Sequence, residues 1–123
     1  MLLSIAPDSD TPIYLQLRHQ IVDALVSGEL REGDQLPSVR QLAVELGINL
    51  HTVNKAYKVL EDEGYLRIYG RRGARITSGP TYNDDYLQQL ADGLERLFTD
   101  ARSHGIDAGQ LRQIVDETIN KGA

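Results

Sequence analysis

The sequence contains no cysteine among its 123 residues. Disulfide bonds, thiolate catalysis and metal sites with cysteine ligands are therefore excluded. No run of about 20 consecutive apolar residues is present, so a membrane-spanning helix is not expected. The N-terminus lacks a basic segment followed by an apolar stretch, which argues against a secretory signal. We therefore expect a cytoplasmic protein without membrane association.

Charge is distributed unevenly along the chain. The net charge is −5, which taken alone argues against a nucleic-acid partner. Between Leu36 and Gly79, however, seven basic residues stand against four acidic ones, a net charge of +3. From Thr81 onward, four basic residues stand against eight acidic ones, a net charge of −4. A basic surface for nucleic acid is thus compatible with an acidic whole.

Residues 1–10 are predicted to form an irregular arm, and a first helix follows them. Thr11 can cap this helix, and Pro12 suits its first position. Gly28 is expected to end it. Residues 30–37 combine glycine, aspartate and proline, which is typical of a loop. Apolar residues at helical spacing predict a buried face made of Ile13, Leu17, Ile21, Ala24 and Leu25.

Two shorter helices are predicted next. Ser38 and Gln41 match a capping box, in which each side chain satisfies a free backbone N–H of the other residue. Gly47 is expected to end this second helix. Asn49 can cap the third helix, and Gly64 is expected to end it. The apolar positions predict burial of Val39, Leu42, Ala43 and Leu46 in the second helix and of Val53, Ala56, Tyr57 and Leu60 in the third.

A hairpin is predicted after the third helix. Residues 65–69 are rich in β-formers, residues 70–73 (GRRG) suit a turn, and residues 74–77 can return as a second strand. Residues 78–80 (SGP) mark the end of this module. The order of helix, short helix, tight turn, helix and hairpin is that of a winged helix-turn-helix. We expect it to occupy residues 11–78.

Residues 81–123 are predicted to form two further helices, separated at Gly105, with Asp107 opening the second. Their apolar stripes are too short to enclose a core of their own, and helices with an unburied face usually find a partner. We interpret this tail as a dimerisation element, although packing against its own module is an alternative. The apolar residues expected at the dimer contact are Leu87, Leu90, Leu94, Leu97, Phe98, Leu111, Ile114, Val115 and Ile119. The expected fold is therefore mainly α with a small β hairpin, a winged helix-turn-helix followed by a short two-helix tail.

The third helix has one polar and one apolar side. A single α-helix fits the major groove of DNA, where base edges present distinct donors and acceptors. The N-terminal end of this helix is largely polar, while its apolar residues point toward the core. The residues expected to approach DNA there are Asn49, Leu50, His51, Thr52, Asn54 and Lys55.

Four segments together closely resemble the GntR family of bacterial regulators. They are residues 35–43 (QLPSVRQLA), 46–49 (LGIN), 52–57 (TVNKAY) and 60–66 (LEDEGYL). The upstream segments PIYLQL at 12–17, with Ile21, and GEL at 28–30 are also similar. The short tail resembles that of the YtrA-type branch, because about 43 residues are too few for the larger effector-binding domains of other branches.

The resemblance implies a homodimeric transcription regulator that binds double-stranded DNA. It places Arg40 at a DNA-contacting arginine of the second helix and residues 70–73 at a wing tip near the minor groove. The positions that meet bases and phosphates in the family correspond to Leu50, His51, Thr52 and Asn54. Ser38, Lys58, Arg71, Arg72 and Gly73 complete the expected DNA-binding set, in which Lys55 and Lys58 can contact phosphate. No cofactor is implied, and a small-molecule effector is possible but is not identified by any residue.

Three positions depart from the family pattern. Many relatives carry arginine where this chain has Leu50 and often another at Asn54, and the YtrA-type pattern more often has proline at the first of these positions and asparagine at His51. Base preference is therefore not transferable. Leu50 can touch a thymine methyl group, and His51 and Asn54 can bond base edges.

Chemical functions other than DNA binding find little support. The three histidines, His19, His51 and His104, lie far apart without a second ligand at useful spacing, so no metal site is expected. Residues 61–63 (EDE) are consecutive on a helix and do not share a face, so we interpret them as a solvated charge run rather than as catalytic carboxylates. We expect no enzyme. The alternative is a protein-interaction module that uses the winged helix without DNA.

Overall fold

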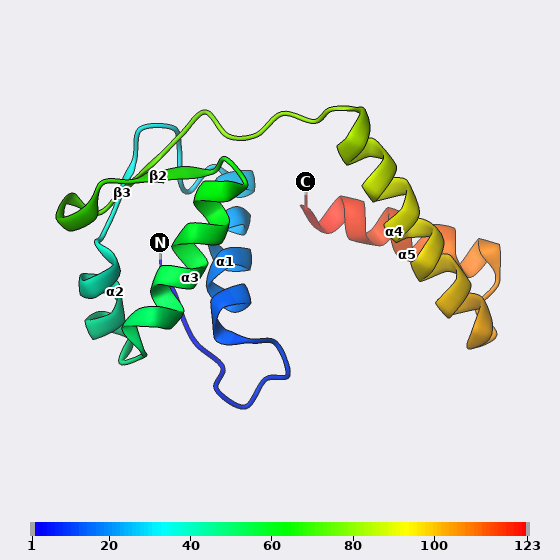
Figure 1. Cartoon of the computed structure of the whole chain (residues 1–123). Helices are drawn as coiled ribbons and strands as arrows, with labels where there is room; N and C mark the ends of the chain where they lie inside the picture. The colour runs from blue at the N-terminus through cyan, green and yellow to red at the C-terminus, as the bar shows by residue number, and fades with distance from the viewer. Residues whose placement is uncertain (1, 123) are drawn as a thin grey trace. The chain divides into compact units, whose positions relative to one another are not determined.

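The computed structural model describes residues 2–122. These residues form two compact units, and the boundary along the chain falls between Pro80 and Thr81. Each unit is described by itself. The first contains three helices and a small sheet, and the second contains two helices (Figure 1). In chain order the elements are α1 (Ile13–Ser27), β1 (Gln35–Leu36), α2 (Val39–Leu46), α3 (Leu50–Asp62), β2 (Leu66–Ile68), the 3₁₀ turn η1 (Gly70–Arg72), β3 (Ala74–Ile76), α4 (Asp84–Ser103) and α5 (Ala108–Gly122).

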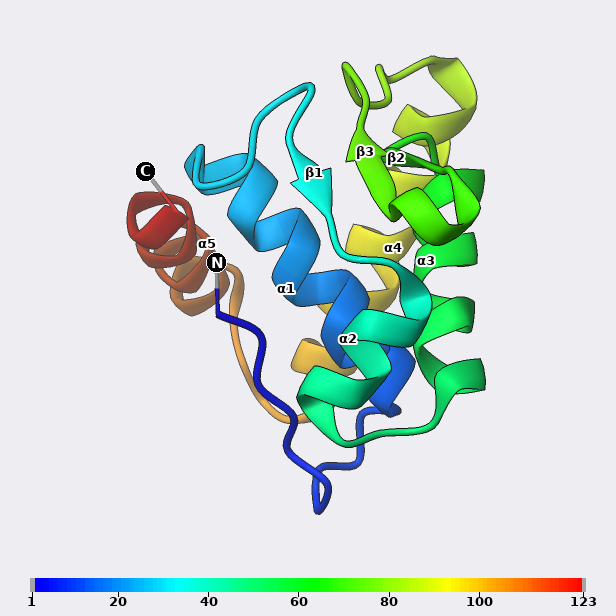
Figure 2. The same ribbon diagram turned by 90° about the vertical axis from the view of Figure 1, so that its left-hand side faces the viewer.

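One hydrophobic core holds the first unit together. Helices α1, α2 and α3 pack around it, and the sheet closes one end (Figure 2). Val39 and Leu46 of α2 and Leu25 of α1 are half-buried but pack against this core, whereas the half-buried Ile13 is not among the residues packed against it. The other apolar positions predicted for α2 and α3 are confirmed as core. The buried set comprises Leu17, Ile21, Ala24, Leu30, Leu36, Leu42, Ala43, Val53, Ala56, Tyr57, Leu60, Leu66, Ala74 and Ile76.

The sheet has three antiparallel strands in the order β1–β3–β2. The predicted hairpin is present as β2 and β3, joined through η1. The prediction of a loop throughout residues 30–37 is wrong, because β1 pairs with β3 there and sets Leu36 opposite Ala74. A strand of two residues is too short to show the period-2 pattern from which strands are predicted.

Side-chain caps fix where α2 and α3 begin. Ser38 Oγ accepts a hydrogen bond from the Gln41 N–H at 3.1 Å, and Gln41 Oε1 accepts one from the Ser38 N–H at 3.0 Å, which confirms the predicted capping box. Asn49 caps α3 by accepting from the His51 N–H at 2.7 Å. The expected cap on α1 is wrong: the helix starts at Ile13, and its N-cap is Pro12, which has no side-chain cap bond.

Residues 2–10 contain no helix or strand, but α1 holds this segment through two glutamines. Gln20 donates to the Ser4 carbonyl at 2.7 Å and accepts from the Ser4 N–H at 3.0 Å. Gln16 forms the same paired bonds with Ala6, at 3.0 and 2.9 Å. Four residues along a helix rise about 6 Å, close to the length of two extended residues, so both amides meet the arm in register.

The second unit consists of α4 and α5. Asn83 caps α4, and Asp107 with Gln110 forms a capping box at the start of α5. Neither helix contains a buried residue, and the predicted apolar stripe is largely exposed, with Leu97 at 66% and Ile119 at 63%. A groove of about 660 Å³ lies between the two helices, lined by residues of this stripe such as Leu94 and Ile114. Within residues 2–122, no helix is long and apolar enough to cross a membrane.

Candidate nucleic-acid interface

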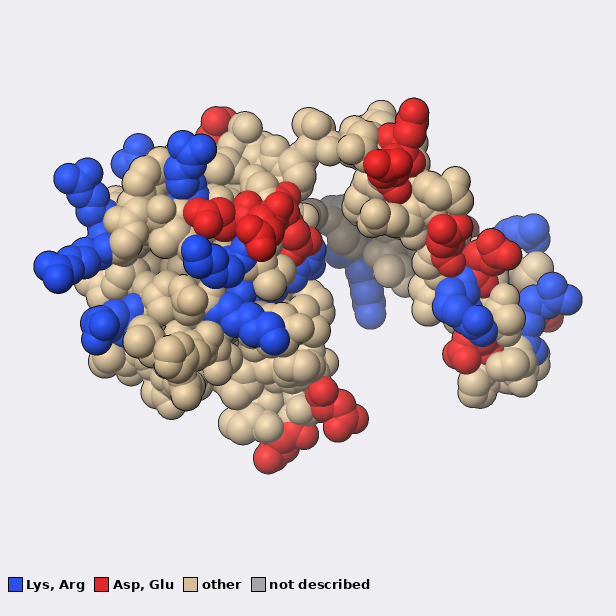
Figure 3. All heavy atoms as spheres, viewed as in Figure 1, with Lys and Arg blue, Asp and Glu red and all other residues tan. Residues whose placement is uncertain are grey.

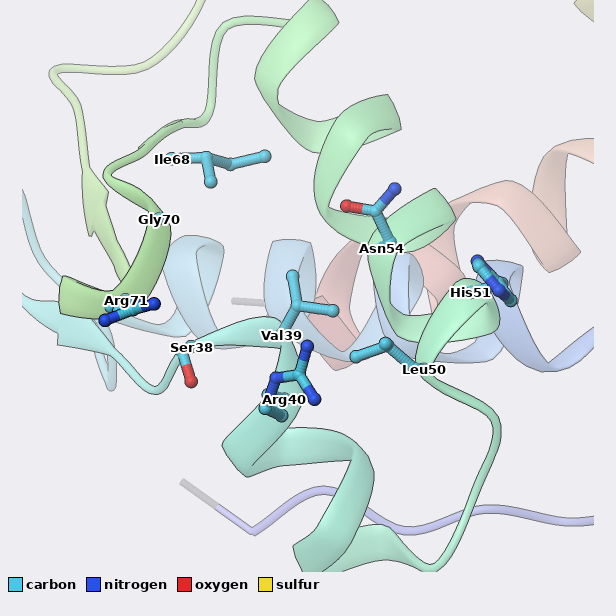
Figure 4. Close-up of a pocket in the computed structure, with 9 residues that line it drawn as sticks. All are labelled: Ser38, Val39, Arg40, Leu50, His51, Asn54, Ile68, Gly70 and Arg71. Carbon is cyan, nitrogen blue, oxygen red and sulfur yellow. The ribbon is translucent and has the colours of Figure 1, made fainter.

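The hairpin of β2, η1 and β3, residues 66–76, is the wing of this fold. An open hollow of about 570 Å³ lies where α2, α3 and the wing meet. Figure 4 shows Arg40 and Leu50 beside Val39, with Arg71 on η1 at the opposite border. His51 and Asn54 border it on the α3 side. The hollow thus combines residues from three separate segments of the chain. Its complete lining is Ser38, Val39, Arg40, Leu50, His51, Asn54, Ile68, Gly70 and Arg71.

The chemistry of the hollow changes from its floor to its rim. The apolar side chains of Val39, Leu50 and Ile68 are half-buried and pack against the core. The guanidinium groups of Arg40 and Arg71 stand on exposed residues, and within residues 2–122 neither one forms an ion pair. Unpaired arginines suit phosphate oxygens, and an apolar floor suits a methyl group or a sugar. Lys and Arg side chains also gather along the edge that carries the wing and α2 (Figure 3).

Two partly buried hydrogen bonds hold the walls of the hollow in place. The Tyr57 hydroxyl donates to the Pro37 carbonyl at 2.8 Å and thereby ties α3 to the segment before α2. Burial raises the pKa of this hydroxyl above its usual range, and the charge of Glu45 acts in the same direction, so Tyr57 remains a donor. Glu61 accepts from the Ile68 N–H at 2.8 Å and ties β2 to α3.

Gly73 brings the wing against the start of α2. Its φ is +89°, and a Cβ placed on it would overlap the Leu36 carbonyl oxygen and come within 3.2 Å of the Ser38 nitrogen. Only glycine permits this backbone approach without displacement. Gly73 is itself buried. Its expected role as a DNA contact is therefore better described as positioning the wing.

The structure brings together half of the DNA-binding residues expected from the sequence. Ser38, Arg40, Leu50, His51, Asn54 and Arg71 line the hollow, although the Ser38 side chain is buried and serves as the α2 cap. The remaining expected residues, Asn49, Thr52, Lys55, Lys58, Arg72 and Gly73, lie outside the lining. Two lining residues escaped sequence reasoning, Val39 and Ile68. Val39 is predicted for the buried side of its helix and Ile68 only for a β-strand, because an apolar residue carries no signal for DNA contact by itself.

The lysines of α3 have partners within the protein. Lys55 Nζ lies 4.1 Å from the centre of the Tyr14 ring, a cation–π contact with α1. Lys58 Nζ lies 4.0 Å from a carboxylate oxygen of Glu61. Both residues are exposed, so these contacts are compatible with phosphate binding, but they favour a structural contribution as well.

Asp62 and Glu63 are exposed and Glu61 is half-buried, but two of the three carboxylates also have partners within the fold. Glu61 bonds the Ile68 N–H as described, and Glu63 accepts two hydrogen bonds from Arg18 of α1, at 3.0 and 2.8 Å. Glu63 raises the pKa of the Arg18 guanidinium. Both carboxylates therefore join elements of the fold. Within residues 2–122, no group of three or more His, Cys, Asp and Glu side chains is arranged to hold a metal ion.

The arrangement of helices, wing and hollow matches a known family. A sequence profile described as "Bacterial regulatory proteins, gntR family" matches residues 13–76. The chain belongs to the GntR family. It is therefore a DNA-binding transcription regulator with a winged helix-turn-helix, and its relatives are named as regulators rather than as enzymes.

Relatives of the full chain support the YtrA-type assignment. The chain is 35% identical over 118 residues to the HTH-type transcriptional repressor YtrA of Bacillus subtilis (strain 168), covering 94% of this chain and 91% of that protein. It is similar to the structure of YtrA from Sulfolobus acidocaldarius, a GntR-family transcription factor, with 37% identity and a TM-score of 0.68 over 80% of this chain and 99% of that one. A Listeria monocytogenes EGD-e structure described as a transcriptional antiterminator gives a TM-score of 0.88 at 26% identity, over 99% and 92% of the two chains.

Proposed function

We propose that this GntR-family protein is a homodimeric repressor whose two subunits each place the hollow of Arg40, Leu50 and Arg71 against one half-site of a pseudopalindromic operator. The observation that carries the proposal is the convergence of two unpaired arginines and the polar end of α3 on one concave, apolar-floored surface. The α3 N-terminus would enter the major groove, and Arg71 would follow the backbone toward the minor groove.

Dimerisation through α4 and α5 is the second part of the proposal. Two amphipathic helices without a single buried residue leave apolar surface in water, which is unfavourable. A second copy of the chain offers the same stripe, and a two-fold axis sets both stripes against each other. The same axis would relate two recognition helices, so that the half-sites lie about one helical turn, 10 base pairs, apart or a multiple of it.

We infer repression from the similarity to YtrA of Bacillus subtilis, which is a transcriptional repressor by name. Occupation of promoter DNA by the dimer would exclude polymerase. A protein with this role needs only stable and selective DNA binding. A dimer provides it because the binding free energies of two weak half-site contacts add.

The first test is selection from a random duplex pool followed by fluorescence anisotropy over a salt series. We expect enrichment of a two-fold symmetric site, and a loss of about 1–3 kcal/mol in binding free energy for Arg40→Ala if this arginine reads a base. Arg96→Ala, which removes the same positive charge from an exposed position of α4, serves as the matched control. The absence of any enriched site, with equal weak binding by both variants, contradicts sequence-specific recognition by the hollow and favours a protein-interaction role for the winged helix.

The dimer is tested by sedimentation equilibrium. Leu94→Asp puts a charge into the apolar groove between α4 and α5, whereas Gln88→Asp changes an exposed polar position of α4. We expect only Leu94→Asp to give monomers and to lose affinity for the symmetric site while it retains weak binding to a single half-site. A wild-type protein that sediments as a monomer at micromolar concentration refutes the dimer.

A further inference from the structure

A row of polar side chains crosses the face of the sheet opposite the core. The register pairs Gln35 of β1 with Arg75 of β3, and Arg75 in turn with Arg67 of β2. Directly paired residues of an antiparallel sheet project from the same face. All three residues are exposed, whereas the neighbouring Ala74 row faces the core.

The pairing of Arg67 with Arg75 is unfavourable by itself. Like charges directly opposite each other destabilise a sheet. Within residues 2–122 neither arginine forms an ion pair, so no carboxylate of the described chain compensates the repulsion. An anion bound between them would remove that repulsion.

A shallow groove of about 170 Å³ continues from this row to the wing. It is lined by Gln35, Tyr69, Arg72 and Arg75, and the Gln35 side-chain amide donates to the Arg72 carbonyl at 2.9 Å. Arginine, glutamine and tyrosine are all side chains that donate hydrogen bonds to DNA phosphates. No carboxylate lines the groove.

We propose that Arg67 and Arg75, with Arg72 and Tyr69, form a second phosphate-binding surface that holds the backbone of the DNA duplex bound in the hollow. DNA is favoured over an acidic protein because the two surfaces are joined through consecutive residues of the wing: Arg71 lines the hollow, and Arg72 lines the groove. A duplex that follows the wing meets both surfaces. The proposal depends on the DNA binding of the family and not on the dimer or on base reading.

The test compares Arg67→Gln/Arg75→Gln with Arg96→Gln/Arg112→Gln, a control of equal charge on exposed positions of α4 and α5. Affinity is measured by anisotropy at several salt concentrations, on the selected duplex and on a duplex of scrambled sequence. Loss of two phosphate contacts lowers the salt slope by about 1.8 per bound subunit. Between 50 and 200 mM salt, the sheet variant should therefore lose about tenfold less affinity than wild type for one bound subunit, and about 150-fold less for a bound dimer. The loss of affinity at low salt should be equal on both duplexes, because phosphate contacts carry no sequence information.

Two outcomes overturn the proposal. One is a salt slope of the sheet variant equal to that of the control, and the other is a loss confined to the selected duplex. Arg67→Lys/Arg75→Lys keeps both charges and should retain most of the slope, which separates phosphate binding from damage to the fold. The thermal midpoint of the glutamine variant should stay equal or rise, since the repulsive pair is gone. Base reading by the hollow is measured separately with Arg40→Ala on the selected duplex, so that its failure leaves this result intact.

Discussion

Replacement of Gly73 by alanine tests whether the wing is held by backbone contact with the start of α2. Gly73→Ala forces a side chain into φ +89° and sets its Cβ against the Leu36 carbonyl oxygen. The matched change is Gly70→Ala, at φ +62° in the same turn but with no atom within 4 Å of the new Cβ. The first variant therefore suffers both backbone strain and overlap, and the second suffers strain alone.

The magnitudes follow from this difference. A left-handed conformation costs an L-residue about 1–2 kcal/mol, which is the expected loss for Gly70→Ala. Gly73, at φ +89° and ψ −146°, lies instead in a region that is open essentially to glycine alone, where a side chain costs about 1–3 kcal/mol. Overpacking adds about 1–3 kcal/mol, so Gly73→Ala should lose about 2–6 kcal/mol in the free energy of unfolding. Urea unfolding followed by circular dichroism measures both. If the wing instead moves to relieve the overlap, the stability loss shrinks and DNA affinity falls in its place.

The refuting result is specific. Equal losses of stability in the two variants, with equal DNA affinity, would mean that the close approach of Gly73 to Leu36 has no energetic weight. The wing would then be positioned by the strand pairing of β2 and β3 alone, and the description of the hollow as a preformed surface would be wrong.

Three further changes have defined outcomes. Tyr57→Phe removes the donor to the Pro37 carbonyl and should cost about 0.5–1.5 kcal/mol of unfolding free energy, measured in urea, because the half-buried Pro37 loses this hydrogen bond. Arg18→Gln breaks a partly exposed pair with Glu63 and should cost no more than about 1 kcal/mol, with a smaller effect at high salt. Leu50→Ala should abolish discrimination between thymine and uracil at one operator position, measured by anisotropy with substituted duplexes, and equal discrimination in both proteins would rule out a thymine methyl on the apolar floor.

Features that depend on neighbouring residues in the chain were predictable from the sequence. The capping box of Ser38 and Gln41 and the cap at Asn49 depend on residues three or fewer positions apart, and both are present. The core of α3 follows from helical spacing alone. The arginine of α2 was located through the family motif, and its place in the hollow agrees with that assignment, although its contact with DNA remains a prediction.

Features that depend on pairing between distant segments were not predictable from the sequence. Strand β1 exists because β3 lies beside it, and two residues show no period of their own. The partners of Glu61 and Glu63 lie on β2 and α1, so a run of three acids looked solvated in the sequence. The Arg67–Arg75 row depends on the hairpin register, which residue types alone do not determine.

The shape of the interface depends on residues that do not contact its surface. Tyr57 lies in the core, and Gly73 is buried in the wing. The hydrogen bond from Tyr57 to the Pro37 carbonyl holds α3 against the segment before α2, and the close approach of Gly73 to Leu36 holds the wing against the same segment. Both contacts converge on residues 36–38, immediately before the helix that carries Arg40. The side chains proposed to read bases can therefore differ between regulators while the walls that present them stay the same. Substitutions at the exposed residues His51 and Asn54 should alter the selected DNA sequence without loss of stability, whereas substitutions at the two buried positions should lower stability first.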